Sequence, residues 1–191
     1  ISATATVDLG GGTYGSTSEF AANVTASSTG IIVVDTTSDV SDGTTTSITN
    51  LGTARGTDGR ISLREAIAAA NNTANGGTPD KIVFNIAAND ANHVYYRDNG
   101  AAGLAGPVAT TLSDAEITDF DANYMAGTAR SWYTITLSGS DLNVTQAVII
   151  DGTTQAGYDP AKGPIIELNA DGVSSGDPNG LTLTTGASTV Q

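Results

Sequence analysis

Acidic side chains are the groups with the clearest chemical potential in this sequence. The chain holds 20 Asp and Glu against 7 Lys and Arg, a formal net charge of −13. Ca²⁺ binds clustered carboxylate and carbonyl oxygens, so calcium is the cofactor that this composition favours. Ordinary Asx turns are the alternative, because Asp is common in turns. The calcium candidates lie in or beside predicted loops and are Asp39, Asp58, Asp119 and Asp121.

Paired carboxylates would also suit glycoside hydrolysis or polysaccharide lyase chemistry. Such catalysis needs two carboxyl groups that converge on one cleft. The acidic candidates are Asp119, Asp121, Asp151 and Asp171, and Arg130 and Lys162 are the basic residues available for an acidic sugar. Asp151 and Asp171 each precede a glycine, which is the pattern of a turn. We therefore predict a non-catalytic chain and keep a carbohydrate-active domain as the alternative.

Aromatic residues make up only 5% of the chain, so an exposed cluster of them would indicate a binding surface. The candidates for stacking on a sugar are Tyr95, Tyr96, Trp132, Tyr133 and Tyr158. Packing against neighbouring strands is the structural alternative. His93 is the only histidine, which excludes any metal site that needs two of them.

Several functional classes are disfavoured by composition. The net charge of −13 opposes binding to nucleic acid and to anionic membranes. The apolar runs are short, so we expect no membrane insertion. The chain has no cysteine, which excludes disulfides and thiolate sites. Gly10, Gly12 and Gly15 match the spacing of a dinucleotide-binding fingerprint, which requires a helix after the last glycine. Residues 16–30 have low helix propensity, so a flexible glycine loop explains the match better.

One short helix is predicted at residues 62–71, in a chain that otherwise reads as strand and turn. Ser62 and Glu65 have the S-x-x-E spacing of a capping box. Leu63 and Ile67 belong to an apolar face with a helical period. We expect this face to cover the open end of a stack of strands, and Arg64 to hold a structural role beneath it.

Short strands are predicted along the rest of the chain. Residues 1–30 form a flexible, β-prone segment, and residues 87–131 form an irregular insertion. Beyond it, strand-like runs start at residues 133, 147, 165 and 181, at intervals of 14, 18 and 16. Helices are absent from this half, which disfavours βαβ units. Parallel strands stacked without crossover helices are compatible with the pattern.

These motifs resemble a known family. Residues 58–85, with Ser-Leu-Arg-Glu-Ala-Ile at 62–67, are similar to the "SLREAI" N-terminal module of bacterial right-handed parallel β-helix proteins. Residues 148–158, 164–168 and 180–183 continue the resemblance, which spans about residues 31–191. Ile61 stands where the family often has cysteine.

The resemblance implies a fold and a biological setting. It predicts an all-β chain, a right-handed parallel β-helix fragment capped by one short α-helix, with residues 31–191 as the module. It implies an exported bacterial surface protein, adhesin-like or filament-forming, located outside the cell. We expect self-association, through β-helix ends or through a strand donated by residues 1–30, or contact with neighbouring domains. The alternative partner is a glycan.

Overall fold

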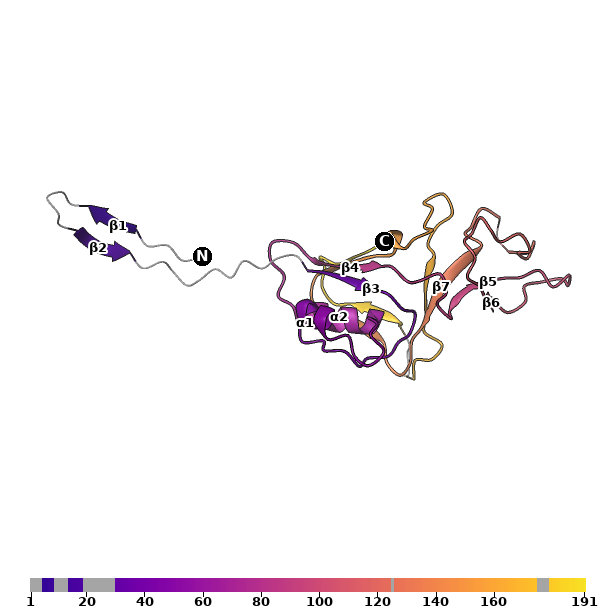
Figure 1. The fold of residues 1–191 in the computed structure, drawn as a ribbon, viewed down its shortest axis with the longest axis horizontal. Helices are drawn as coiled ribbons and strands as arrows, with labels where there is room; N and C mark the ends of the chain where they lie inside the picture. Colours follow the sequence, from indigo (N-terminus) through magenta and orange to yellow (C-terminus); the bar gives the residue numbers. More distant parts are fainter. Residues whose placement is uncertain (1–4, 9–13, 19–29, 125, 175–178) are drawn as a thin grey trace.

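The computed structural model describes residues 5–8, 14–18, 30–124, 126–174 and 179–191. Within these residues, strands are short and separated by turns, and two α-helices lie near one another below β3 and β4 in Figure 1. No described helix has both the length and the apolar character needed to span a bilayer.

The largest parallel sheet has the order β12-β9-β4-β3. Its strands are β3 (Ile31–Val34), β4 (Asp80–Phe84), β9 (Val148–Asp151) and β12 (Thr189–Val190). Runs of β-branched residues favour this geometry. Alternate residues turn inward, as in β3, where Ile32 and Val34 are buried while Ile31 and Val33 face outward. One face of the sheet thus forms part of the core.

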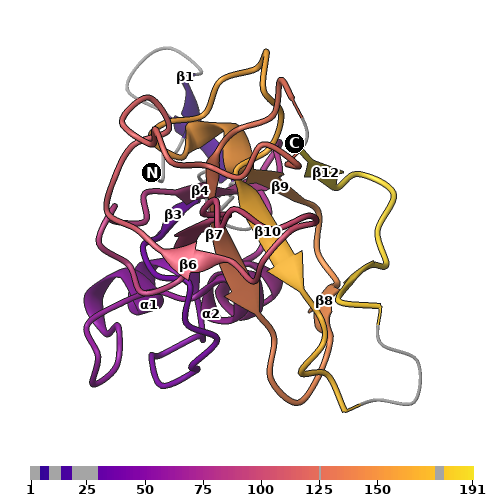
Figure 2. The ribbon, with the colours of Figure 1, turned by 90° about the vertical axis from the view of Figure 1, so that its right-hand side faces the viewer.

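A second sheet has the order β10-β7-β5-β6 and mixes two directions. Its strands are β5 (His93–Tyr95), β6 (Val108–Ala109), β7 (Ser131–Thr136) and β10 (Ile166–Asn169). β10 pairs in parallel with β7, beside which it lies in Figure 2, whereas β5 is antiparallel to both β7 and β6. Two pairs complete the strands: parallel β8 (Leu142–Val144) with β11 (Leu181–Leu183), and antiparallel β1 (Ala5–Asp8) with β2 (Tyr14–Ser18).

Helix α2 (Leu63–Asn71) begins at a capping box and packs on the strands through its apolar face. Ser62 caps it: its Oγ accepts from the Glu65 N–H at 3.2 Å, and Glu65 Oε2 accepts from the Ser62 N–H at 3.0 Å. Leu63 and Ile67 are 4% and 3% exposed and belong to the core shared with β3, β4, β8 and β9. The apolar face of α2 is therefore buried against strands.

A second helix, α1 (Ile48–Thr53), forms where only strand and turn were predicted. Ser47 caps it, and Ile48 and Leu51 turn one face into the core. The Thr, Asn and Gly residues of this segment have low helix propensity. Its six residues form a helix here because tertiary burial outweighs that propensity.

The predicted all-β right-handed parallel β-helix is wrong. The described residues form several small sheets, parallel and mixed, with two α-helices, and not a clear solenoid. The main departure is at residues 87–131, where β5 and β6 join the second sheet in the antiparallel direction. The intervals of 14, 18 and 16 residues thus reflect short strands of different sheets.

Most of residues 1–30, including Gly10 and Gly12 of the glycine motif and most of the predicted donated strand, lie outside the described residues. Gly15 lies within β2, and residues 16–18 continue that strand. A dinucleotide fingerprint needs a helix directly after its last glycine. The described backbone therefore does not provide the phosphate-binding helix of that motif.

Candidate functional site

Asp39, a predicted calcium ligand, is held by a basic residue. Arg64 Nε and Nη2 donate to its two carboxylate oxygens at 2.9 and 2.7 Å, and the Ser138 N–H donates to Oδ2 at 2.7 Å. Arg64 Nη2 also donates to the Ser140 carbonyl at 2.8 Å. This pair ties α2 to the loop before α1 and to the turn after β7. Asp39 and Arg64 thus have a structural role.

Asp58, the second calcium candidate, forms an Asx turn. It is exposed and accepts from the Arg60 N–H at 2.8 Å. Its contacts match the turn interpretation of the sequence.

Asp119 and Asp121 lie in the same loop but have different partners. Asp119 accepts from Tyr95 Oη at 3.1 and 3.2 Å. Asp121 is fully buried, and its Oδ1 accepts from the backbone and side-chain N–H groups of Asn123, each at 2.8 Å. Among the described residues, no group of three His, Cys, Asp or Glu side chains converges as a metal site. Calcium binding stays a prediction.

Asp151 and Asp171 occupy turns. Asp151 Oδ1 accepts from Thr153 Oγ1 at 2.6 Å and caps the 3₁₀ turn Gly152–Thr154. That hydrogen bond holds the pKa of Asp151 below its ordinary value, although burial acts in the opposite direction. Asp171 is exposed and follows β10.

Three aromatic side chains, Tyr96, Tyr124 and Trp132, form a cluster on the outer side of β7. The ring of Tyr96 lies 5.2 Å from that of Tyr124 and 5.1 Å from that of Trp132. Tyr124 and Trp132 are nearly parallel, 5.8 Å apart at an interplanar angle of 14°. All three are half-buried, so the cluster keeps a solvent-facing surface.

The cluster forms one wall of a pocket of about 440 Å³. Glu167 lies in this pocket because β10 pairs in register with β7, which places Glu167 opposite Thr134. Glu167 Oε2 accepts from Trp132 Nε1 at 2.8 Å and from Thr134 Oγ1 at 2.7 Å. The carboxylate therefore fixes the indole of Trp132 and remains exposed itself.

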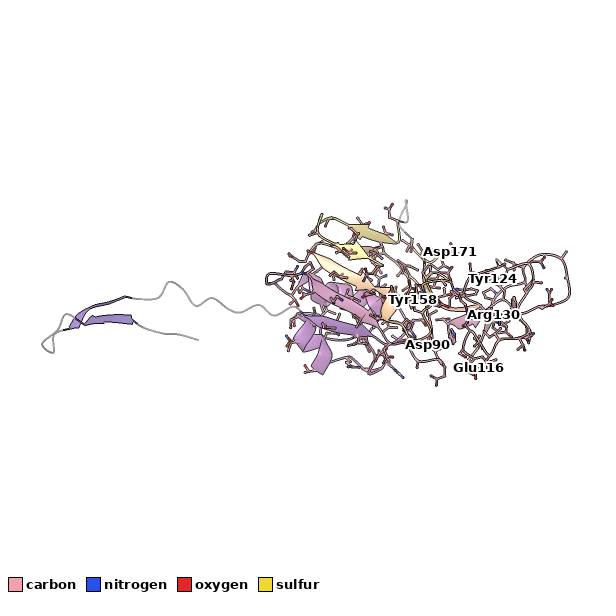
Figure 3. All side chains as sticks on the ribbon, turned by 90° about the horizontal axis from the view of Figure 1, so that it is seen from above. Asp90, Glu116, Tyr124, Arg130, Tyr158 and Asp171 are labelled. Carbon is pink, nitrogen blue, oxygen red and sulfur yellow. The ribbon has the colours of Figure 1, made fainter. Side chains whose placement is uncertain are left out.

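A basic residue lies at the same pocket. Lys162 lines it and donates to Asp114 Oδ2 at 2.5 Å, and the Arg130 N–H donates to Asp114 Oδ1. Burial raises the pKa of Asp114, but these hydrogen bonds outweigh burial and hold the pKa below its ordinary value. Figure 3 shows Arg130 and Tyr124 in the part of the molecule that carries the loops before β7. The 87–131 segment thus supplies one wall of the pocket.

The predicted aromatic residues separate into two groups. Tyr96 and Trp132 join the cluster, whereas Tyr95 and Tyr133 are 7% and 5% exposed and Tyr158 lines a different, apolar pocket. Within β7, alternation explains the split, since Trp132 and Tyr133 point to opposite faces. Sequence reasoning missed Tyr124 and Glu167. Glu167 carries a usable signal, because it alternates with the inward-facing Ile166 and Leu168 of a strand.

Comparison of the chain with models of protein families, with curated proteins and with solved structures found no match. The candidate site therefore depends on its own geometry.

Proposed function

We propose that this chain is a non-catalytic glycan-binding module, and that its binding site is the aromatic pocket between β7, β10 and the loop of Tyr124. The observation that carries the proposal is the convergence of three aromatic rings and one fixed carboxylate on a pocket of about 440 Å³. Pockets that bind small ligands combine apolar walls with a few placed polar groups.

The chemistry of the pocket suits a neutral sugar. The C–H face of a pyranose ring packs against the face of an aromatic side chain, and sugar hydroxyls donate to carboxylate oxygens. Glu167 uses Oε2 for Trp132 and Thr134, and no hydrogen bond to its Oε1 is found among the described residues. Glu167 Oε1 is thus available to a sugar hydroxyl, while Lys162 donates to a ring or hydroxyl oxygen.

Binding is favoured over hydrolysis by the number of carboxylates. Glycoside hydrolases use two carboxyl groups that flank the scissile bond. Glu167 is the one carboxylate among the described residues that line this pocket. Asp119 and Asp121 are held by Tyr95 and Asn123 instead.

The biological setting is part of the same proposal. A glycan-binding module fits an exported bacterial surface protein with an adhesin-like role, as the family resemblance implies. The net charge of −13 supports high solubility outside the cell.

Self-association is a second proposal, favoured by one observation at β3. This strand ends its sheet, without a further strand partner among the described residues, and exposes Ile31 and Val33 by 61% and 36%. An open edge with outward apolar residues is a template for strand addition. Sedimentation velocity over a wide concentration range should show association that the double variant Ile31→Lys and Val33→Lys abolishes. A monomer at every concentration would contradict it.

Isothermal titration against neutral and uronate-containing oligosaccharides tests the glycan site. We expect a neutral oligosaccharide to bind, and Trp132→Ala to weaken binding at least about tenfold, because the lost contact and stacking total roughly 1.5–3 kcal/mol. Tyr158→Ala is the matched control, since Tyr158 is an aromatic residue outside the pocket. Equal weakening by both variants, or no binding of any glycan, would overturn the proposal.

A further inference from the structure

A separate pocket of about 300 Å³ is lined in part by β5 and β7 of the second sheet. The antiparallel register sets His93 opposite Tyr133 and Tyr95 opposite Ser131, so these four side chains share the inward face of β5 and β7. Trp132 of the aromatic pocket points to the other face of β7. The polar residues that line the second pocket are His93, Thr111, Ser113, Asp114, Glu116, Ser131 and Tyr133.

His93 presents a hydrogen-bond acceptor to this pocket. It is 3% exposed, and its ring stacks on that of Tyr133 at 4.3 Å and 11°. Nδ1 lies 2.8 Å from the Ala88 carbonyl oxygen, which can only accept, so Nδ1 carries the proton. In the tautomer with the proton on Nδ1, Nε2 is an acceptor, and no partner for it is found within the described ranges. Because His93 lines the pocket, Nε2 can accept a hydrogen bond from a ligand that enters it.

Ser131 adds a second buried polar group. It is 6% exposed, and its backbone pairs with Tyr95 of the neighbouring strand. No hydrogen bond of Ser131 Oγ is found in the described part of the chain. As a diagonal neighbour of His93 across the two strands, Ser131 can contact the same small molecule.

The charges around the pocket favour a cation. Asp114 and Glu116 both line it, and Lys162, which pairs with Asp114, lines the aromatic pocket instead. Glu116 Oε2 accepts from Ser113 Oγ at 2.6 Å, which fixes the carboxylate beside the pocket. The lining thus holds two carboxylates and, among the described residues, no Lys or Arg side chain. A net charge of −13 also disfavours an anionic ligand.

We propose that this second pocket binds a small organic amine, whose N–H groups donate to His93 Nε2 and Ser131 Oγ. The apolar part of the amine would pack against Ile86, Ile165 and the ring of Tyr133, which also line the pocket. The described residues bring no three metal-ligating side chains together, so an organic cation fits the lining better than a metal ion. The inference does not depend on the glycan site.

The test is an NMR titration of the full chain with three probes of one shape: benzylamine, benzyl alcohol and benzoate. We expect benzylamine to shift the imidazole resonances of His93 with a Kd on the order of 1 mM, as suits a ligand of this size. Benzyl alcohol should bind more weakly, and benzoate should not bind. Equal shifts by all three probes, or no shift at His93, would overturn the proposal.

Two variants make the result specific. Ser131→Ala removes one hydroxyl from a buried position, and it should weaken benzylamine binding about tenfold or more, the effect of losing one hydrogen bond to a charged group. Trp132→Ala should leave benzylamine binding unchanged. If Trp132→Ala abolishes it while Ser131→Ala does not, the amine sits on the aromatic cluster by cation–π contact and the second pocket is not its site.

Discussion

At the scale of single residues, Asp80 is the clearest buried charge. It is fully buried in β4; Oδ1 accepts from the Gly30 N–H at 2.6 Å, while Oδ2 has no hydrogen-bond partner. Burial raises its pKa above the ordinary value of 3.8, and the Gly30 hydrogen bond offsets this only in part. A carboxyl with a raised folded pKa stabilises the fold fully below its unfolded pKa, and that contribution is lost as the pH rises through the folded pKa.

Asp80→Asn should therefore stabilise the fold near neutral pH by about 1 kcal/mol, because a neutral amide costs less to bury than a carboxylate. At pH values below the ordinary pKa the advantage should vanish, since Asp80 is then protonated. Urea denaturation at neutral and acidic pH measures both differences. Asp58→Asn is the same change at an exposed turn, and it should leave the free energy of unfolding unchanged at both pH values. An Asp80→Asn variant that is less stable than the wild type at neutral pH would contradict this expectation.

Glu65 is a second buried carboxylate, and its hydrogen bonds should contribute strongly to the stability of the fold. It is 1% exposed and accepts from the backbone N–H groups of Asp42, Gly43 and Ser62 at 2.7–3.0 Å. Glu65→Ala leaves three donors without an acceptor, so we expect the free energy of unfolding to fall by about 3 kcal/mol or more.

Glu116 provides the control for Glu65. Ser113 and Glu116 repeat the S-x-x-E spacing, and the Glu116 carboxylate likewise accepts from the serine N–H and Oγ, but both residues are exposed. Glu116→Ala should leave the free energy of unfolding almost unchanged, as surface changes usually do. Similar losses in both variants, measured by chemical denaturation, would mean that the burial of Glu65 contributes nothing.

These residues also show how far a sequence can be interpreted at this scale. The Ser62–Glu65 pair is local, so its spacing alone predicts it. The bond of Asp39 to Arg64 and Ser138 joins residues distant in sequence, and the contact of Glu167 with Trp132 depends on strand register. Composition shows how many aspartates the chain holds, but not which of them are hydrogen-bonded to other residues. It therefore suggested calcium ligands at aspartates that have protein partners in the fold.

At the scale of elements, the buried face of α2 should contribute measurably to the free energy of unfolding. Ile67 is 3% exposed and belongs to the core that joins α2 to the strands. Ile67→Ala should reduce the free energy of unfolding by about 2–4 kcal/mol through lost burial and the cavity left behind. Ile31→Ala removes the same atoms from a position that is 61% exposed and should cost under about 1 kcal/mol. Thermal or urea denaturation of the two variants measures both losses in the free energy of unfolding. Equal losses would mean that Ile67 does not belong to the core.

Elements differ in how readily the sequence reveals them. The apolar period and cap predict α2, and the β-branched runs predict β3, β4 and β9. β5 and β6 have three and two residues, too few for a periodic pattern. Their antiparallel direction arises from packing of the 87–131 segment on β7, which no local pattern encodes, and this is why the predicted β-helix failed.

At the scale of the whole molecule, the net charge of −13 opposes compaction. Salt screens such repulsion, so NaCl should raise the melting temperature by roughly 3–6 °C between low and moderate ionic strength. CaCl₂ at matched ionic strength separates screening from specific binding. A larger rise with CaCl₂ would support the predicted calcium site, and a melting temperature that falls with NaCl would contradict the electrostatic argument.

Trp132 gives the most direct test of the glycan pocket, because it is the only tryptophan in the chain and its ring forms part of the pocket wall. The measurement is the intrinsic fluorescence of the full chain during titration with a neutral oligosaccharide. A saturable change in intensity or wavelength that Glu167→Gln weakens is the predicted result, since Glu167 fixes the indole at 2.8 Å. An emission spectrum that no glycan alters at any concentration would contradict the proposed site.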